Sequence, residues 1–386
     1  MKNIEGEIFV VDNNSTDGSK AFFYNKFPQI KFSWNTTNEG FAKANNKALQ
    51  QASGDYILFL NPDTIVSEDS FEKCISFIRS KNNLAACGVK MIDGSGQFLD
   101  ESKRAFPAPM TSLYKLSGLS KLFPKSKIFS KYHLGYLDEN INHEVDVLAG
   151  AFMMVPKKII EEVGGFDESF FMYGEDIDLS YRIQKAGYKN FYFSETCIIH
   201  FKGESTKKGS LNYVKMFYKA MSVFVKKHYG GTKAGLFNFF IQVGIFFRAA
   251  LSAVARFFSR SKPAVRPINT EITQAIIAGS PEDFNEVSTL FQTCGISKQA
   301  VGRISEGELA EPDTTGLSNT LVEILSAKNA NEIIFCEGQL SFKKIISILP
   351  YIPKYIDIIF FAVHLHSLIS SSDKNEAGIF ILMENK

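Results

Sequence analysis

The ten residues GDYILFLNPD, Gly54 to Asp63, decide the fold class. The apolar run Asp55 to Leu60 ends in a polar turn that begins at Asn61, and a run this hydrophobic predicts a strand in the centre of a sheet. The pattern also occurs upstream, where the apolar residues Ile8 to Val11 end in a polar cluster. Strands that end in carboxylate-bearing turns and alternate with helices indicate an open α/β sheet, in which ligands bind at the carboxyl ends of the strands.

The periodicity of the flanking sequence predicts the other elements of this first unit. Strands are expected at 8–11, 30–34, 55–60, 85–92, 190–193 and 196–200. Helices are expected at 20–25, 41–52, 70–80, 157–163 and 175–186. Residues 95–143 carry three prolines and many polar side chains, which predicts an irregular, loop-rich insertion.

Composition excludes several classes of protein. The chain has 386 residues, 45% of them hydrophobic and 22% charged, which is typical of a globular protein of two domains. A net charge of +2 gives no reason to expect a nucleic-acid partner. The five cysteines form no CxxC pair, which argues against a disulfide scaffold or a cysteine zinc site and fits a reducing compartment. Met1 to Glu7 lacks the apolar stretch of a secretory signal.

One long segment carries charge of a single sign. Between Ser205 and Thr270 the chain has twelve basic residues and no acid, and Leu236 to Phe258 within it is an apolar helix candidate. A spanning helix needs about 20 uninterrupted apolar residues, and its Arg248 would cost roughly 2.5–3.5 kcal/mol in the bilayer. An amphipathic helix lying in the interface of an anionic membrane is therefore favoured over a spanning one. A core helix that links two domains is the third alternative, against which the one-signed charge argues.

A second α/β pattern follows this segment. Strands are expected at 273–278, 300–304, 332–335 and 356–363, and helices at 282–294, 317–327 and 341–349. The pattern predicts a small Rossmann-like domain. Its first turn offers only Gly279 and lacks GxGxxG, so dinucleotide binding is unsupported. The chain is thus expected to divide into residues 1–232, a basic segment at 233–270, and a C-terminal domain at 271–386.

Two clusters of candidate site residues follow predicted strands, and each has a plain structural alternative. Asp12 and Asp17 can serve a ligand site, but they also fit turn and helix-cap chemistry. Asp63 lies in the turn after the most hydrophobic strand, at the edge of the sheet where ligands bind, and turn chemistry explains it equally well.

Two further clusters lie later in the chain. Glu175, Asp176 and Asp178 open a predicted helix, where acids are stabilised by the helix dipole. The aromatic run Phe170 to Tyr173 just before them suggests the wall of a site with a catalytic acid or base. His200 ends an apolar strand and is either a structural residue or a metal ligand.

In this order, the motifs resemble the family 2 glycosyltransferases. The stretches VVDNNSTDGS (10–19), NEGFAKANN (38–46) and GDYILFLNPD (54–63) carry the resemblance. The later stretches GAF (150–152), GGFDE (164–168) and FFMYGEDIDL (170–179), with His200, are similar to the rhamnosyltransferase-like branch. The resemblance covers about residues 5 to 230. The C-terminal domain resembles, more loosely, the nucleotide-binding-type domain found beside bacterial polyprenyl-phosphate sugar transferases.

This resemblance implies a GT-A fold and an inverting transferase that uses a nucleotide-sugar donor. Asp63 and His200 would hold Mg²⁺ or Mn²⁺ against the diphosphate. Asp176 would be the general base that deprotonates the acceptor hydroxyl, with Glu175 as its competitor, whereas Asp178 would be structural. The residues implied for donor binding, with Asp12 at the nucleobase, are Asp12, Asn14, Asp17, Asn38, Gly40, Asn45 and Asn61.

The chain departs from the family pattern at two points. The family usually has one more strand and helix before residue 8, so the GT-A-type Rossmann-like sheet is expected to lack its usual first strand. Asn61 stands at the first position of the Asp-X-Asp motif, as in many members of this branch. The truncated sheet leaves open a non-catalytic binding or scaffold protein.

The function expected from the sequence is transfer of a deoxyhexose such as rhamnose to a glycan or lipid-linked acceptor in polysaccharide synthesis. The enzyme is expected to be peripheral, on the cytoplasmic face of the plasma membrane. Transfer of another hexose or of galactofuranose is the alternative enzyme activity.

Overall fold

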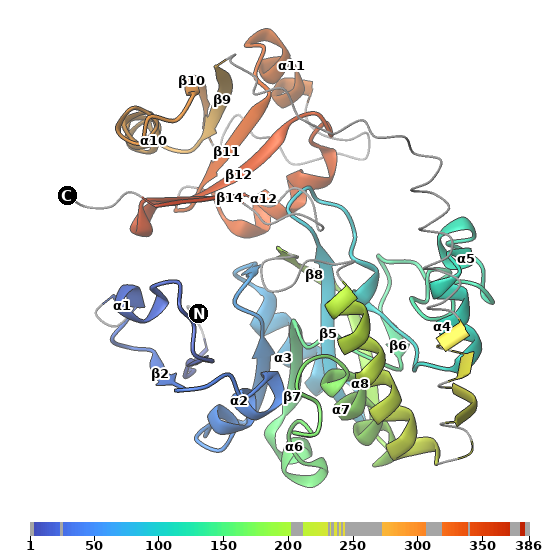
Figure 1. Cartoon of the computed structure of the whole chain (residues 1–386). Helices are drawn as coiled ribbons and strands as arrows, with labels where there is room; N and C mark the ends of the chain where they lie inside the picture. Colours follow the sequence, from blue (N-terminus) through green and yellow to red (C-terminus); the bar gives the residue numbers. More distant parts are fainter. Residues whose placement is uncertain are drawn as a thin grey trace.

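The computed structural model describes residues 4–23, 26–201, 211–230, 272–305, 319–338, 340–370 and 379–382, with scattered positions between 232 and 243. Figure 1 shows an N-terminal unit with two sheets and a C-terminal unit with a third. The predicted helix at 236–258 and the predicted boundaries near 233 and 270 lie largely outside the described residues. Among the helices that are described, none is both long and apolar enough to cross a bilayer.

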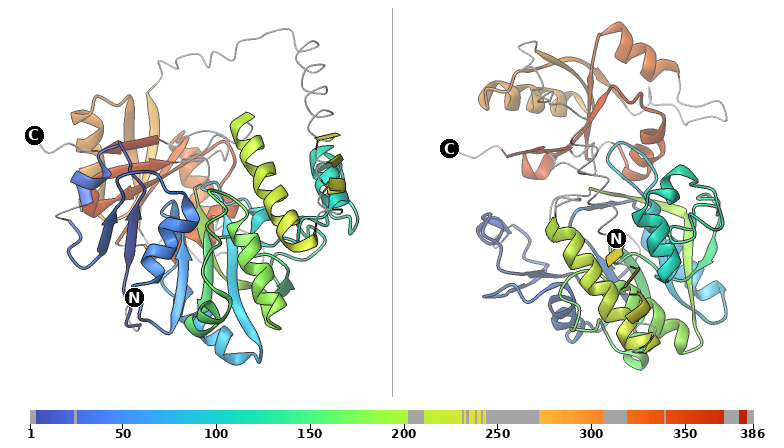
Figure 2. Two further views of the ribbon diagram at one scale, coloured as in Figure 1. Left: turned by 60° about the horizontal axis from the view of Figure 1, so that its bottom comes forward. Right: turned by 45° about the vertical axis from the view of Figure 1, so that its right-hand side comes forward.

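The N-terminal residues form a small parallel sheet of their own. Strand β1 (Phe9–Asp12) pairs with β2 (Lys31–Trp34), and helix α1 (Ser19–Phe23) connects them. Asp12 lies opposite Trp34 at the carboxyl ends of the two strands. Helix α2 (Phe41–Leu49) lies between this sheet and the main sheet, as both Figure 1 and Figure 2 show, and its Ala42 is fully buried.

The main sheet is mixed. Its order is β3 (Tyr56–Leu60), β7 (Phe152–Pro156), β5 (Leu84–Ile92), β8 (Lys189–His200) and β4 (Thr64–Val66), and β6 (His143–Val145) also pairs with β8. Strands β5 and β8 are parallel, whereas the other pairs are antiparallel. The α/β class predicted from the sequence is confirmed.

The prediction that β3 is central in its sheet is wrong. Among the described residues β3 pairs only with β7, so it is an edge strand. Its hydrophobicity has another cause, because both of its faces are covered. Ile57 and Phe59 pack in the core beneath α2, while Tyr56 and Leu58 pack against the core on the opposite face. Burial of two faces makes a strand apolar whether or not it has neighbours on both edges.

Helices cover both faces of the main sheet. On one face lies α3 (Ser70–Ser80). On the other lie α2, α6 (Lys157–Val163) and α7 (Glu175–Lys185), and α8 (Leu211–Tyr229) packs against α7 from outside. Strand β8 was predicted as two short strands but is continuous. Its pairing with β5 jumps from Phe193 to Cys197, so the polar residues between them form a bulge and not a break.

The segment predicted to be irregular, 95–143, contains helices. These are α4 (Pro109–Leu116), α5 (Leu119–Leu122) and the 3₁₀ turn η1 (Asp100–Ser102). The prolines misled the prediction because Pro109 occupies the first turn of α4, where a missing N–H costs nothing. The hydroxyl of Thr111 accepts a hydrogen bond from the backbone N–H of Ala108 at 3.0 Å and closes that helix start.

The C-terminal unit is a second α/β sheet. Its order is β10 (Lys298–Ile304), β9 (Thr273–Ala278), β11 (Glu332–Cys336), β12 (Asp357–Ala362), β13 (Ser367–Ser370) and β14 (Ile379–Leu382). The first four strands are parallel and follow the Rossmann-like order 2-1-3-4. The helices α10 (Pro281–Thr293), α11 (Asn319–Ala327) and α12 (Phe342–Ile348) connect them. The antiparallel pair β13–β14 was not predicted.

The two units share one apolar core. Ile92, Ile199 and Phe201 of the N-terminal unit pack with the buried residues of the C-terminal sheet, among them Leu349 and Phe360. The C-terminal unit therefore rests on the side of the main sheet formed by β4 and β8.

Candidate active site

Asp176 lies near the N-terminus of α7 in a nearly closed polar setting. Its Oδ2 accepts hydrogen bonds from Nη2 of Arg104 at 2.5 Å and from the N–H of Gly150 at 3.3 Å. Its Oδ1 accepts one from the N–H of Ile177 at 2.8 Å. The Asp176 side chain is 14% exposed and that of Arg104 10%. Burial lowers the pKa of Arg104, but the charges and hydrogen bonds of Asp176 and Tyr132 together outweigh burial and hold that pKa above its ordinary value.

Glu175, the neighbour of Asp176, has a different protonation state. Burial, with the adjacent charge of Asp176, raises the pKa of Glu175 to about 8. Its Oε2 is buried and has no hydrogen-bond partner among the described residues. At neutral pH Glu175 is therefore mostly a neutral acid, which distinguishes it from Asp176, the residue that the sequence analysis preferred as the base.

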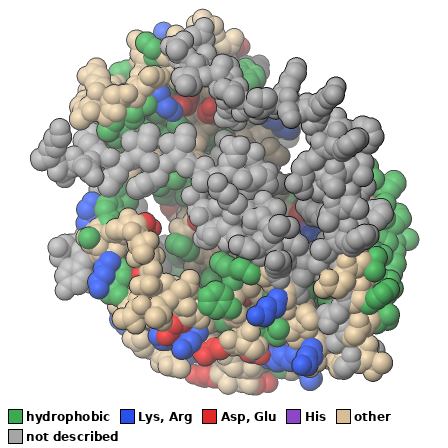
Figure 3. Space-filling view, in the orientation of Figure 1, with side chains coloured by type: hydrophobic (Ala, Val, Ile, Leu, Met, Phe, Trp, Pro, Cys, Tyr) green, Lys and Arg blue, Asp and Glu red, His purple; other side chains and the backbone are tan. Residues whose placement is uncertain are grey.

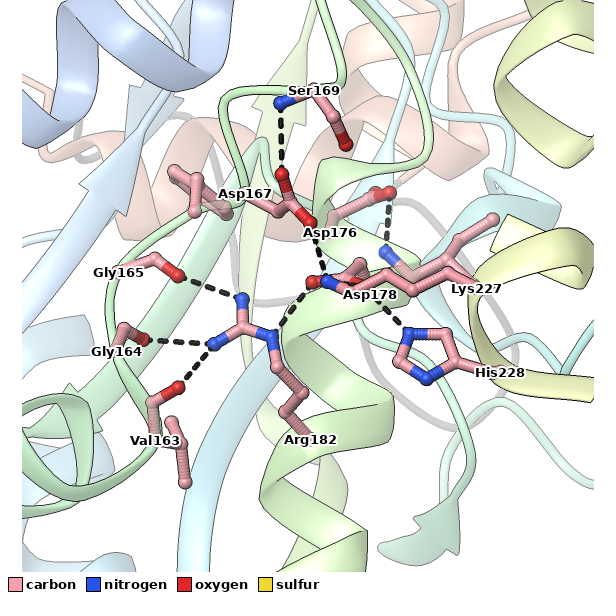
Figure 4. Close-up of polar contacts among 12 residues, drawn as sticks. Val163, Gly164, Gly165, Asp167, Ser169, Asp176, Asp178, Arg182, Lys227 and His228 are labelled. Carbon is pink, nitrogen blue, oxygen red and sulfur yellow. Dashed lines mark hydrogen bonds and ion pairs between the residues drawn. The ribbon is translucent and has the colours of Figure 1, made fainter. Parts of the chain in front are cut away.

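Asp178 has the contacts of a structural residue (Figure 4). Its carboxylate is fully buried and contacts Nζ of Lys227 at 2.8 Å, Nε2 of His228 at 2.7 Å and Nε of Arg182 at 2.7 Å. Burial raises the pKa of Asp178, but the hydrogen bonds from Lys227 and His228 and the charge of Arg182 bring it below its usual value. Lys227 also pairs with Asp167. The cluster therefore fastens α8 to α7.

Asp63 and His200 lie together where β4 and β8 pair. Nε2 of His200 is 3.2 Å from Oδ1 of Asp63 and 3.5 Å from Nδ2 of Asn61. Thr64 is the register partner of His200, which explains why residues 137 positions apart in sequence meet. Two further atoms here, Oδ1 of Asn61 and Nδ1 of His200, are buried without a hydrogen-bond partner among the described residues.

This donor set fits a hard divalent cation that also binds a substrate. Within the described part of the chain no group of three or more His, Cys, Asp or Glu side chains is placed to hold a metal ion. Mg²⁺, however, is commonly bound by one or two carboxylates together with phosphate oxygens and water. Asp63 and His200, with the unpartnered amide oxygen of Asn61, offer that kind of incomplete shell.

The turn after β1 is tied to the N-terminus of α2 through Asn13, a residue that the sequence analysis missed. Asn13 donates to Oδ1 of Asn38 and to the carbonyl of Gly40, both at 3.1 Å, and accepts from the N–H of Glu39 at 3.0 Å. Gly40 has φ +86°, and a Cβ there would lie 2.5 Å from the carbonyl of Phe171. Only glycine fits this approach.

The remaining residues predicted for donor binding use their side chains locally. Asp12 accepts from the N–H of Ser15 at 3.0 Å, and Asp17 accepts from the hydroxyl of Ser19 at 2.6 Å. Asn45 donates to the carbonyl of Phe41 at 2.9 Å within α2. Asn14 is exposed in a left-handed conformation with φ 68°. Their roles toward a donor stay predictions.

Gly150 and Ala151 connect Asp176 to the Asn61–Asp63–His200 group. The N–H of Gly150 contacts Asp176, while the carbonyl of Ala151 accepts from the N–H of Asn61 at 3.1 Å. A Cβ on Gly150 would lie 3.9 Å from the ring of Phe41 at the start of α2. The structure thus brings the Asp176 pair and the Asn61–Asp63–His200 group to the two sides of one short loop.

Arg104 is the second functional candidate that the sequence analysis missed. It lies in the segment predicted to be irregular, where no motif marks it. Besides Asp176, its Nη2 donates to the carbonyl of Leu148 at 2.8 Å. The signal that could have found it is the need of a buried carboxylate for a cationic partner.

Comparison with known proteins agrees with the motifs. Residues 3–164 match the family model "Glycosyl transferase family 2". The chain is 23% identical over 235 residues to N-acetylglucosaminyl-diphospho-decaprenol L-rhamnosyltransferase of Mycobacterium tuberculosis, covering 58% of this chain and 76% of that protein. It is 33% identical over 171 residues to rhamnosyltransferase WbbL of Escherichia coli K12, covering 42% and 61%.

A solved structure, the mannosyltransferase PcManGT of Pyrobaculum calidifontis in complex with GDP-Man and Mn²⁺, is similar with a TM-score of 0.39 and 15% identity, over 67% of this chain and 68% of that one. The family match and the α/β architecture confirm the GT-A-type Rossmann-like class. The N-terminal part of the chain, residues 3–164, therefore matches the family 2 glycosyltransferases, and the chain is similar to two rhamnosyltransferases.

Proposed function

We propose that the protein transfers a sugar from a nucleotide-sugar donor to a glycan or lipid-linked acceptor in the synthesis of a cell-surface polysaccharide, with inversion at the anomeric carbon. The observation that carries the proposal is the placement of the Asp176 carboxylate and the Asn61–Asp63–His200 group on the two sides of the Gly150–Ala151 loop. One group supplies a base and the other supplies ligands for the diphosphate side of a donor.

Asp176 is the base in this proposal. A general base must be unprotonated and within reach of the acceptor hydroxyl. Glu175 fails the first condition at neutral pH because its pKa is about 8. Asp176 is ion-paired and held by three donors, so its orientation is fixed before the acceptor arrives. Arg104 would stay with the carboxylate and receive no proton.

Asn61, Asp63 and His200 would hold Mg²⁺ or Mn²⁺ at the diphosphate. A bound divalent cation supplies Lewis-acid stabilisation of the charge on a departing nucleoside diphosphate. The chain's own contribution is the fixed spacing of Asp63 Oδ1 and His200 Nε2 and the unpartnered oxygen of Asn61. Asp12 would contact the nucleobase from the end of β1, where Trp34 is its register partner.

The best-supported donor sugar is a deoxyhexose such as rhamnose. Two similar proteins carry the word rhamnosyltransferase in their names, and one of the names specifies a decaprenol-linked acceptor. A lipid-linked acceptor would require the enzyme to work at a membrane surface. We place it, as a peripheral protein, on the cytoplasmic face of the plasma membrane, where nucleotide sugars would be available.

A surface of the lobe formed by residues 102–137 supports membrane contact. Residues 102–137 contain no acid, and the lysines at 121, 125, 127 and 131 are exposed without an ion pair in the described structure. Leu122 and Phe123 at the end of α5 and Ile128 beyond it are 72%, 51% and 63% exposed. Figure 3 shows hydrophobic side chains along the right-hand edge, where Figure 1 places α4 and α5. Apolar tips among unpaired lysines fit an anionic lipid interface.

The single tryptophan offers a direct test of donor binding. Trp34 is half-buried at the end of β2 and stacks on Phe32 with a ring separation of 5.4 Å. A nucleoside diphosphate bound beside Asp12 should change its fluorescence. We expect Mn²⁺ together with one of dTDP, UDP or GDP to quench the fluorescence of Trp34. During turnover with an acceptor, the sugar conjugate of that same nucleotide should yield the free nucleoside diphosphate. No fluorescence change and no nucleotide release with any of the three would overturn the proposed function.

A further inference from the structure

Asp63 immediately precedes β4 and His200 ends β8, and the chain beyond both residues leads directly into the contact between the two units. Phe201 follows His200, and its backbone N–H donates to the carbonyl of Asp63 at 2.8 Å. His200 and Thr64 are register partners. The backbone of Phe201 therefore fixes Asp63 and His200 relative to each other.

The side chain of Phe201 belongs to the C-terminal unit's core. It is 6% exposed, and its ring meets the ring of Phe360 edge-on, with centroids 5.4 Å apart and planes at 74°. Phe360 lies in β12 and is itself 4% exposed. Edge-to-face aromatic pairs of this geometry hold a defined orientation as well as burying apolar area.

The residues after Asp63 are fastened to the same unit by polar contacts. The carboxylate of Glu68, just beyond β4, accepts hydrogen bonds from the backbone N–H groups of Phe342 at 2.6 Å and Lys343 at 3.0 Å. Nζ of Lys343 lies 2.9 Å from Asp69. The two chain segments that bear the cation ligands are therefore each held by the C-terminal unit within a few residues of the ligand.

We propose that the C-terminal unit is a positioning part of the cation site, and that Phe360 acts on it through Phe201. The inference rests on the proposed role of Asp63 and His200 in cation binding. Ligands must be held to a fraction of an ångström to bind a small cation well. Loss of the Phe201–Phe360 contact would free the end of β8 and the turn at Asp63 together. Asp176 lies on the other side of the Gly150–Ala151 loop and would keep its Arg104 contact.

The chain offers a matched control for this proposal. Phe361 is the next residue in β12, is 1% exposed, and packs on the opposite face of the sheet with the core of Ala275, Ile277 and Val287. Phe360→Ala and Phe361→Ala delete the same atoms from the same strand. Both should lower the thermal stability of the C-terminal unit, but only Phe360→Ala removes a contact to Phe201.

The experiment measures Mn²⁺ binding to the full-length chain by the electron paramagnetic resonance of free Mn²⁺, with and without the nucleoside diphosphate that quenches Trp34. We expect Phe360→Ala to weaken Mn²⁺ binding about tenfold, within the range seen for residues that act on a distant ligand. Phe361→Ala should bind Mn²⁺ within about twofold of wild type, because it removes no contact to Phe201. Phe360→Leu, which keeps most of the apolar volume, should restore most of the affinity and guards against failure to fold.

Amide hydrogen exchange gives a readout that needs no metal. In Phe360→Ala the peptide containing His200 and Phe201 should exchange faster, whereas in Phe361→Ala it should exchange as in wild type. Equal losses of Mn²⁺ affinity in the two alanine variants would overturn the proposal, because they would mean a general loss of stability. Unchanged affinity in Phe360→Ala would overturn it as well. A wild-type chain that binds no Mn²⁺ would refute the cation assignment in the proposed function, and the exchange data alone would then decide whether Phe360 holds the His200 segment.

Discussion

Arg104 and Asp176 form an ion pair of 2.5 Å in which both side chains are largely removed from solvent. The two residues come from different parts of the N-terminal unit, Arg104 from the lobe before α4 and Asp176 from the first turn of α7. A buried charge is tolerated only with a partner, so each residue fixes the other. Of the two adjacent acids Glu175 and Asp176, it is Asp176 that the guanidinium of Arg104 orients.

Removing the carboxylate of Asp63 should weaken binding of the nucleotide in the presence of metal. In Asp63→Ala, with Mn²⁺ present, we expect the affinity for the nucleoside diphosphate to fall about 10- to 100-fold, as for the loss of a metal-site residue. Chelation by EDTA should have the same effect on wild type. Glu72→Gln, which removes an exposed acid of α3, serves as the charge control. A wild-type enzyme that is fully active in excess chelator would refute the role of Asp63.

Stability should depend on pH through Glu175. Its pKa is about 8 in the folded chain and near 4.5 when unfolded. At a pH between these two values, Glu175 is therefore protonated in the folded state and ionised in the unfolded state. Unfolding free energy should therefore fall as pH rises from about 5 to 8, by up to about 1.4 kcal/mol per pH unit. Glu175→Gln resembles the neutral acid and should remove most of this slope. Thermal melting at several pH values measures it, and parallel curves for the two proteins would contradict the assignment.

Asp178 should matter for stability more than for chemistry. Asp178→Asn leaves Lys227 and Arg182 without the buried charge that they face, which should cost about 3 kcal/mol. Asp167→Asn removes the other, more exposed partner of Lys227 and should cost less than about 1 kcal/mol. Denaturant unfolding of the two variants provides the comparison. Equal losses would show that burial of the Asp178 cluster does not determine its contribution.

Membrane binding should depend on both charge and apolar side chains. We expect the full chain to sediment with anionic vesicles and only weakly with neutral ones, because each engaged lysine or arginine contributes about 1 kcal/mol. High salt should release part of the bound protein from the anionic vesicles. Replacing Phe246 and Phe247, which lie outside the described residues, with Ser should leave a remnant that salt removes fully.

The described lobe gives a second variant for the same assay. Leu122→Ser with Phe123→Ser should weaken binding to anionic vesicles several-fold, since two exposed apolar side chains are lost from a basic surface. Ile141→Ser is the control, because Ile141 is 55% exposed but follows Asp138 and Glu139. Binding to neutral and anionic vesicles alike, resistant to alkaline carbonate, would indicate a spanning helix. If Ile141→Ser weakened vesicle binding as much as the Leu122→Ser, Phe123→Ser double change, the lobe would not be part of the membrane-binding surface.

Local sequence patterns predicted most of the elements but not their long-range pairing. Helix α3 and helix α6 begin and end where periodicity placed them, because apolar spacing is a local signal. The edge position of β3 was missed, since burial on two faces and pairing on two edges leave the same apolar signature. Arg104 and Asn13 were missed because their importance lies in partners many positions away. Asp63 and His200 were named correctly as neighbours, but only because the family resemblance joined them.

The most direct test of the account is acceptor-dependent release of nucleoside diphosphate by Asp176→Asn compared with wild type and Glu175→Gln. We expect Asp176→Asn to lower kcat by about 10²- to 10⁴-fold, the usual contribution of a general base, while donor binding measured through Trp34 stays within a few-fold. Glu175→Gln should retain most of the wild-type rate, because Glu175 is already neutral at pH 7. Near-full turnover by Asp176→Asn together with an inactive Glu175→Gln would contradict the account and exchange the roles of the two acids.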